Sequence, residues 1–76
     1  MNWNQEARGL LRAEMARRKI SYKVLANRLE KIGVQESVKG IANKIGRGTF
    51  SFAFFLQCMK ALEIQRVELR DVQDVT

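Results

Sequence analysis

Residues Ser37 to Leu62 read SVKGIANKIGRGTFSFAFFLQCMKAL, and this stretch decides the fold. Its first half is short, basic and amphipathic, and its second half is apolar almost all round. Ser37 and Ser51 are good N-cap residues, because a serine hydroxyl accepts a hydrogen bond from the free amides of a first helical turn. Gly46 and Gly48 separate the two halves and are typical of a helix end. The stretch therefore predicts two helices joined by a glycine-rich corner.

The first helix of this pair has two distinct faces. Apolar residues recur at helical spacing on the side that we expect to be buried, namely Val38, Ile41, Ala42 and Ile45. The other side is expected to face outward and carries Lys39, Gly40, Asn43, Lys44 and Arg47. This helix combines a narrow apolar contact with a polar, basic outer surface.

Two further helices are predicted before this stretch. Ser21 caps the nearer one and Gly33 ends it. Its expected inward face consists of Tyr22, Leu25, Ala26, Leu29 and Ile32. The first helix is expected from about Asn4 to Arg18, with Trp3 covering its start. Its expected inward face consists of Ala7, Leu10, Leu11 and Met15.

The helix after Ser51 is expected to reach about Leu62, with Phe50 and Phe55 at the positions of a hydrophobic staple. Because it is so apolar, we expect it in the centre of the fold or in a subunit interface. The tail is ambiguous: residues 67–70 alternate like a short strand, whereas Val72 and Val75 suit a last helical turn. A lone strand would need a second copy to pair with, so the tail suggests a homodimer.

Composition restricts the class of protein. The chain has 76 residues and no Pro, which predicts one all-α domain over residues 1–76, with a core of about residues 4–69. One Cys and no His argue against a disulfide framework or a metal site, and Cys58 is expected to pack in the core. We find neither a signal-peptide pattern nor an apolar run of about 18 residues. We therefore expect a cytoplasmic protein with no membrane segment.

Charge is distributed unevenly along the chain. Up to Gly48 there are eleven Lys and Arg against four Glu, a net charge of +7, and from Thr49 onward three against four, a net charge of −1. The basic surface therefore belongs to the first three helices and favours a polyanionic partner. Solvated helix faces with no partner are the simpler alternative.

Catalysis has little support in the sequence. There is no His, and the Ser and Thr residues have no obvious base beside them. Residues 46–49, Gly-Arg-Gly-Thr, lack the spacing of a phosphate-binding P-loop. We therefore expect no enzyme activity and no cofactor.

Binding to double-stranded DNA is better supported, because the major groove accepts a helix with small, amide and basic side chains. The expected groove contacts are Ser37, Lys39, Gly40, Asn43, Lys44 and Arg47. The expected phosphate contacts are Tyr22, Lys23 and Arg28, together with basic residues near the end of the first helix. Asn43 could instead serve as a local cap or a buried hydrogen-bonding residue.

Several short motifs resemble the λ-repressor-like helix-turn-helix domains of small bacterial and phage regulators. They are Ser21 to Ala26 (SYKVLA), Ile41 to Ile45 (IANKI), Arg47-Gly48, Phe55-Leu56 and Ala61-Leu62. The resemblance covers about residues 4–69 and implies a bundle of four or five helices that binds DNA as a homodimer. The string from Ala7 to Leu62 more closely resembles a small bacterial family of unknown function.

Two features depart from the λ-repressor-like pattern. Ala26 and Ile41 are farther apart than is typical, which implies a longer second helix and a wider turn. Gly46 stands where that family commonly has an acidic residue, so one ion pair at the corner is absent. The resemblance implies a sequence-specific transcriptional regulator. The alternative is a protein-interaction module, such as an adaptor or antitoxin-like partner, that uses the apolar fourth helix and the tail.

Overall fold

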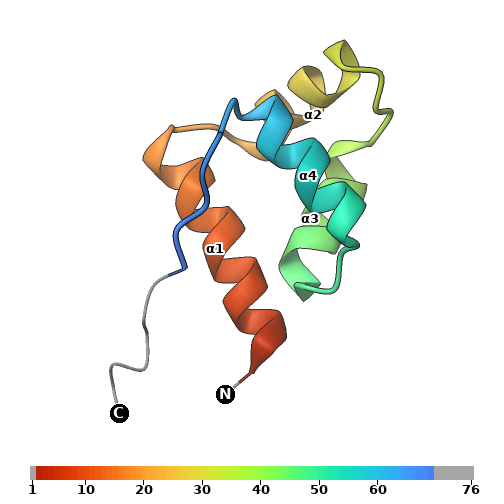
Figure 1. The fold of residues 1–76 in the computed structure, drawn as a ribbon. Helices are drawn as coiled ribbons and strands as arrows, with labels where there is room; N and C mark the ends of the chain where they lie inside the picture. Colours follow the sequence, from red (N-terminus) through yellow and green to blue (C-terminus); the bar gives the residue numbers. More distant parts are fainter. Residues whose placement is uncertain (1, 70–76) are drawn as a thin grey trace.

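The computed structural model describes residues 2–69, which form four α-helices and no strand (Figure 1). The helices are α1 (Trp3–Arg17), α2 (Tyr22–Lys31), α3 (Val38–Arg47) and α4 (Phe52–Ala61). Each begins at or next to the residue expected from the sequence, and the predicted all-α fold is confirmed for this part of the chain. None of the described helices is both long and apolar enough to cross a membrane.

A side-chain oxygen caps the N-terminus of each of these helices. The hydroxyls of Ser21, Ser37 and Ser51 accept hydrogen bonds from first-turn amides of α2, α3 and α4 at 3.2, 2.9 and 3.0 Å. The Asn2 side chain accepts from two amides of α1, at 3.0 and 3.2 Å. A cap of this kind stabilises a helix by about 1 kcal/mol. The serines identified in the sequence therefore fix three of the helix starts.

The helices end in left-handed residues. Gly33 and Gly48 follow α2 and α3 with φ of 87° and 69°, as their positions in the sequence predict. Lys19 and Glu63 adopt the same conformation after α1 and α4, with φ of 56° and 59°. For residues that carry a Cβ, this conformation costs about 1–2 kcal/mol. The ends of α1 and α4 therefore carry backbone strain that the glycines at the ends of α2 and α3 avoid.

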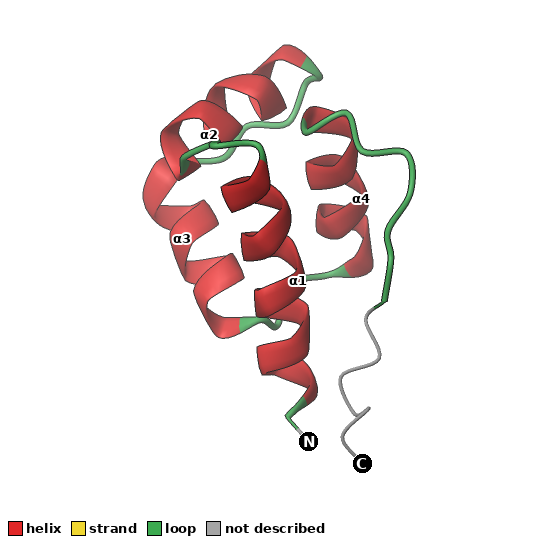
Figure 2. Ribbon diagram, turned by 90° about the vertical axis from the view of Figure 1, so that its left-hand side faces the viewer, coloured by secondary structure: helices red, strands yellow, loops and turns green. Residues whose placement is uncertain are grey.

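The core lies where the four helices meet (Figure 2). Within residues 2–69, α3 packs against α1 and α2, and α2 also packs against α4. The buried apolar residues are Leu11, Met15, Leu25, Leu29, Ile41, Ile45, Phe54, Cys58, Met59, Ala61 and Leu62. The α4 helix supplies more of them than any other described helix, so its apolar sequence forms a large part of the core.

The corner between α3 and α4 packs tightly against α1. Gly48 is buried, and a Cβ placed on it would overlap the backbone carbonyl of Asn4. On the other side of the corner, the rings of Phe50 and Phe55 stack with centroids 6.4 Å apart and planes 7° apart. The predicted staple is therefore present, and the corner holds the end of α3 against the start of α1.

Three apolar residues are more exposed than their sequence pattern suggested. Trp3 does not cover the core, because its side chain is 73% exposed at the start of α1. Val38 and Ile32 were expected on buried faces, and both are exposed. They lie at the two ends of the α2–α3 loop, at the edges of the apolar faces of these helices.

The tail leaves the core soon after α4. Ile64 packs against the core, and its amide donates to the Met59 carbonyl at 2.9 Å. Residues 64–69 then continue without helix or strand. The alternating pattern at residues 67–70 therefore forms no strand in its described part, while the turn expected around Val72 and Val75 lies outside the described residues.

Candidate nucleic-acid interface

Three polar side chains form a stripe along the outer face of α3. Lys39, Asn43 and Arg47 are exposed and follow one another at intervals of four residues, so they lie on one side of the helix. The opposite side carries Ile41 and Ile45, which are fully buried. Among residues 2–69, none of the three outer side chains makes a hydrogen bond or an ion pair. These three residues, here called the α3 stripe, are free to contact a partner.

The start of α3 is shaped by its neighbours Ser37 and Glu36. The Ser37 hydroxyl caps the helix by accepting from the Gly40 amide. A Cβ on Gly40 would lie 3.0 Å from the Ser37 hydroxyl oxygen and 3.2 Å from a Glu36 carboxylate oxygen. Gly40 therefore makes room for the cap and for the Glu36 side chain. This gives the glycine a structural role independent of any approach to DNA.

Lys44 does not belong to the outward face on which the sequence pattern placed it. Its ammonium group binds the Glu36 carboxylate at 2.5 Å and lies 4.8 Å from the centre of the Phe54 ring. The side chain is 42% exposed and turns toward α4. The pattern could not reveal this, because a lysine stem can lie along an apolar surface while its charge reaches a partner. Lys44 holds α3, the α2–α3 loop and α4 together.

Tyr22 and Lys23 lie at the start of α2, as expected. The Lys23 side chain is exposed. The Tyr22 hydroxyl accepts a hydrogen bond from Nε of Arg12 at 3.3 Å, so it ties the start of α2 to α1. Lys23 is therefore free to contact a phosphate, and Tyr22 can do so together with Arg12.

Arg28 has a structural contact instead of an outward position. It is half-buried, and its guanidinium donates to the backbone carbonyl of Ala61 at 3.4 Å. That carbonyl lies at the end of α4, where backbone acceptors have no partner within the helix. Arg28 therefore fastens α2 to α4, which the spacing of the sequence could not predict.

Two arginines of α1, Arg8 and Arg12, lie near the end of α3. Arg8 donates to the Gly46 carbonyl at 3.3 Å, near the end of α3. A Cβ on Gly46 would lie 4.0 Å from a guanidinium nitrogen of Arg12. Neither residue is among the contacts expected from the sequence, although their four-residue spacing indicates that they share one face of α1. Their charges extend the basic surface from the end of α3 onto α1.

The basic residues at the end of α1 were expected to contact phosphates, and two of them are engaged elsewhere. Arg17 and Arg18 form ion pairs with Glu14 at 3.6 and 2.5 Å. Glu14 is buried, so these arginines compensate its charge. The contribution of α1 to a polyanion surface therefore comes from the Arg8 and Arg12 side and not from its last turn.

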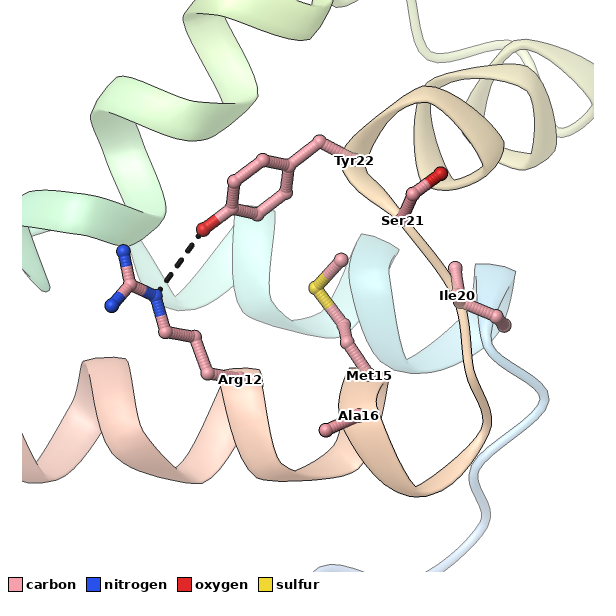
Figure 3. A pocket seen from close by; sticks show the side chains of 6 residues that line it. All are labelled: Arg12, Met15, Ala16, Ile20, Ser21 and Tyr22. Atoms are coloured by element: carbon pink, nitrogen blue, oxygen red, sulfur yellow. Dashed lines mark hydrogen bonds between the residues drawn. The ribbon is translucent and has the colours of Figure 1, made fainter.

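A shallow groove of about 400 Å³ lies between the end of α1 and the start of α2 (Figure 3). Met15, Ala16 and Ile20 give it an apolar floor, and Arg12 and Tyr22 approach each other across one end. It is an open depression with one polar end. The groove continues the surface on which Arg12 meets α3.

The described residues contain no cluster of three or more His, Cys, Asp or Glu that could hold a metal ion. Cys58 is fully buried, and its burial, aided by the charge of Glu36, raises the pKa of the thiol to about 12, although Lys44 opposes this. A thiol with such a pKa stays protonated at neutral pH and is a poor nucleophile. Cys58 therefore acts as a small core residue, as expected.

Comparison with family models matches residues 3–67 to the domain of unknown function DUF6471. No curated protein and no solved structure matches the chain. The family match covers all four helices and the beginning of the tail. It agrees with the closer of the two resemblances noted in the sequence, the one that implies no activity. The chain therefore belongs to the DUF6471 family, whose function is unknown.

Proposed function

We propose that this protein binds double-stranded DNA through α3 and the start of α2, as a small sequence-specific regulator of transcription in the bacterial cytoplasm. The observation that carries the proposal is the α3 stripe, whose three polar side chains are exposed and free of described partners. Ile41 and Ile45 are the buried side chains of α3, so much of the helix surface is left for contact with a DNA groove. The resemblance to λ-repressor-like domains supports the same function.

The chemistry of the α3 stripe suits base recognition. The major groove of B-DNA is about 12 Å wide and admits one helix. The carboxamide of Asn43 matches the paired donor and acceptor of adenine, while Lys39 and Arg47 match guanine or phosphate oxygens. From Lys39 to Arg47 the helix rises about 12 Å, which corresponds to three or four base pairs. The stripe therefore presents one amide between two cations.

The proposed phosphate contacts lie outside the α3 stripe, at the start of α2 and on α1. Lys23 and the pair formed by Arg12 and Tyr22 lie at the start of α2 and on α1. Two acidic residues of the basic half are neutralised within the fold, because Glu14 pairs with Arg17 and Arg18, and Glu36 pairs with Lys44. Their charges therefore weaken the attraction to a polyanion less than free carboxylates would.

The connection between α2 and α3 is longer than in a typical helix-turn-helix. Residues 32–37 separate the two helices, whereas a helix-turn-helix commonly has a turn of about 3–4 residues. Two contacts steady α3 despite the longer loop: Glu36 with Lys44, and Arg8 with the Gly46 carbonyl. The second contact lies at the corner where λ-repressor-like domains commonly have an acidic residue.

The test is a titration of fluorescent random-sequence and genomic duplexes at low and moderate salt. Affinity should fall with salt with a slope of about 0.9 for each phosphate neutralised. Arg47→Ala should weaken binding, either by relaxing the sequence preference or by reducing the salt slope by about one. The matched control is Arg66→Ala, which removes the same charge from an exposed position in the tail. It should leave both the affinity and the preference nearly unchanged.

Asn43→Ala distinguishes the recognition of bases from the electrostatic attraction to phosphates. It changes no charge, so the salt slope should stay constant, while discrimination against the wrong base falls by about 1–3 kcal/mol. Failure of the wild-type chain to bind any duplex at low salt would overturn the proposal. Equal affinity for all duplexes would leave DNA binding but remove the sequence-specific regulator.

A further inference from the structure

The outer face of α4 is apolar although it is exposed. Phe52 is 72% exposed and Leu56 is 52% exposed, and Ala53 between them is also exposed. These residues lie opposite the buried side chains of the same helix, Phe54 and Cys58. We call Phe52, Ala53 and Leu56 the α4 face. Contiguous apolar residues on the outside of a small protein are typical of a contact with another molecule.

The aromatic side chains of this face are held in place. The Phe52 ring packs on Phe55 with centroids 6.2 Å apart and planes 23° apart, and Phe55 stacks in turn on Phe50. An exposed ring that is already ordered loses little conformational freedom when a partner covers it. The α4 face is therefore prepared for a contact, whereas a single mobile apolar residue would not be.

Charge indicates which partner fits. The chain carries +7 up to Gly48, so two copies repel each other wherever these surfaces meet. From Thr49 onward the net charge is −1, and the α4 face itself carries no charged residue. A second copy can therefore approach through α4 at little electrostatic cost. We propose that two copies of this chain form a symmetric dimer in which the α4 faces pack against each other.

A two-fold axis near Leu56 gives this contact a simple geometry. Phe52 and Lys60 lie four residues to either side of Leu56, on the same exposed side of the helix. In an antiparallel crossing, residue i of one copy contacts residue j of the other, and the reverse contact is also made. Phe52 then meets Lys60 of the partner subunit, and a cation over an aromatic ring is favourable. The two Lys60 charges lie at opposite ends of the contact and do not repel at close range.

The proposed dimer does not depend on the proposed DNA binding, and it leaves the α3 stripe uncovered. In the view of Figure 2, α3 is drawn to the left of α1 and α4 to its right. Because α4 has only ten residues, the contact is short. Small interfaces are typical of weak and transient association, so we expect the dimer to form at micromolar to millimolar concentrations. This arrangement replaces the tail strands that the sequence suggested as the dimer contact.

The experiment is sedimentation equilibrium of the full chain from micromolar to millimolar concentration, at moderate salt. The wild type should change from monomer to dimer over this range. Phe52→Ala should raise the dissociation constant at least tenfold, because it removes the apolar ring and, with it, the contact with Lys60 of the partner subunit at each end of the interface. Leu56→Glu should have a larger effect, because the two glutamates meet at the axis. The matched control is Gln65→Glu in the exposed tail, which adds the same charge outside the α4 face and should leave the dimer intact.

Circular dichroism checks that these substitutions of exposed residues leave the helices folded. A further variant, Lys60→Glu, removes the cation that is proposed to lie over the Phe52 ring of the partner subunit. It should weaken the dimer less than Leu56→Glu. A wild type that stays monomeric at millimolar concentration, or a dimer unaffected by Phe52→Ala and Leu56→Glu, would overturn the proposal. DNA binding is measured separately with single short duplexes, on which monomeric Phe52→Ala should keep the salt slope of the wild-type monomer. The two proposals can thus fail independently.

Discussion

The helices α3 and α4 are equal in length and begin alike, yet they have opposite surfaces. Each has ten residues and follows a serine cap. The α3 helix buries two residues and exposes a polar stripe, whereas α4 buries four and exposes an apolar face. With so small a buried face, α3 depends on polar and backbone contacts for its position. The buried face of α4 is larger, so contacts with the core fix the position of this helix. Two helices of equal length are therefore held in place by different interactions: polar and backbone contacts for α3, and apolar burial for α4.

The largest effect is expected at the end of α3. Gly48→Ala would place a Cβ against the Asn4 carbonyl and force an L-residue to keep φ at 69°. Either α1 or the α3–α4 corner must move, so the free energy of unfolding should fall by at least about 3 kcal/mol. Urea denaturation followed by circular dichroism measures this loss.

The matched control for that substitution is Gly33→Ala at the end of α2. Gly33 also has a positive φ, of 87°, but a Cβ there would have no atom within 4 Å. Only the conformational cost of about 1 kcal/mol should remain. Equal losses at the two glycines would show that the contact with Asn4 contributes nothing.

The stability of the protein should decrease at alkaline pH because of Cys58, on the buried side of α4. Burial raises the pKa of the Cys58 thiol from 9.0 to about 12, so the folded state keeps the proton that the unfolded state releases. This contribution to stability is intact below pH 9 and is lost as the pH rises toward 12. The free energy of unfolding should fall by about 1.4 kcal/mol per pH unit within that window.

Cys58→Ala isolates the effect of the thiol from that of other groups that titrate at high pH. The variant should be less stable at neutral pH because it loses core contacts, but its stability should fall less steeply above pH 9. Parallel curves for the variant and the wild type would contradict the protonated, buried thiol. Chemical denaturation at a series of pH values provides both curves.

Substitutions on the two sides of α3 should have different effects on stability. Lys44→Ala removes the ion pair with Glu36 and the contact with Phe54, so stability should fall by about 1 kcal/mol. Arg47 is exposed and has no described partner, so Arg47→Ala should change stability by less than about 0.5 kcal/mol. Its effect should appear in the salt dependence of DNA binding instead. A reversed result would place Lys44 on the binding surface.

Local signals in the sequence were sufficient to predict the helices. The three serine caps, Gly33 and Gly48 each act within a few residues, so their helix boundaries could be predicted without knowing the packing. Three residues of the predicted contact set, Lys39, Asn43 and Arg47, also lie where an amphipathic pattern places them.

The residues that were misplaced depend on contacts distant in the chain. Lys44 turns toward Glu36 and Phe54, and Arg28 reaches the Ala61 carbonyl. A hydrophobic pattern identifies the buried face of a helix, but it cannot say which neighbouring helix borders each edge of that face. Long cationic side chains at such edges reach partners that only the tertiary structure brings near.

The smallest expected effect is a gain in stability at the end of α4. Glu63 is exposed and holds the left-handed conformation that Gly48 holds after α3, with φ of 59°. Glu63→Gly should relieve a strain of about 1–2 kcal/mol, and the greater freedom of glycine in the unfolded chain offsets part of this. The net gain should be about 0.5 kcal/mol. Glu63→Ala removes the same charge but keeps a Cβ, so it should give no gain. If both variants were equally stabilised, the cause would be the lost charge, and the difference between the ends of α3 and α4 would not be one of backbone strain.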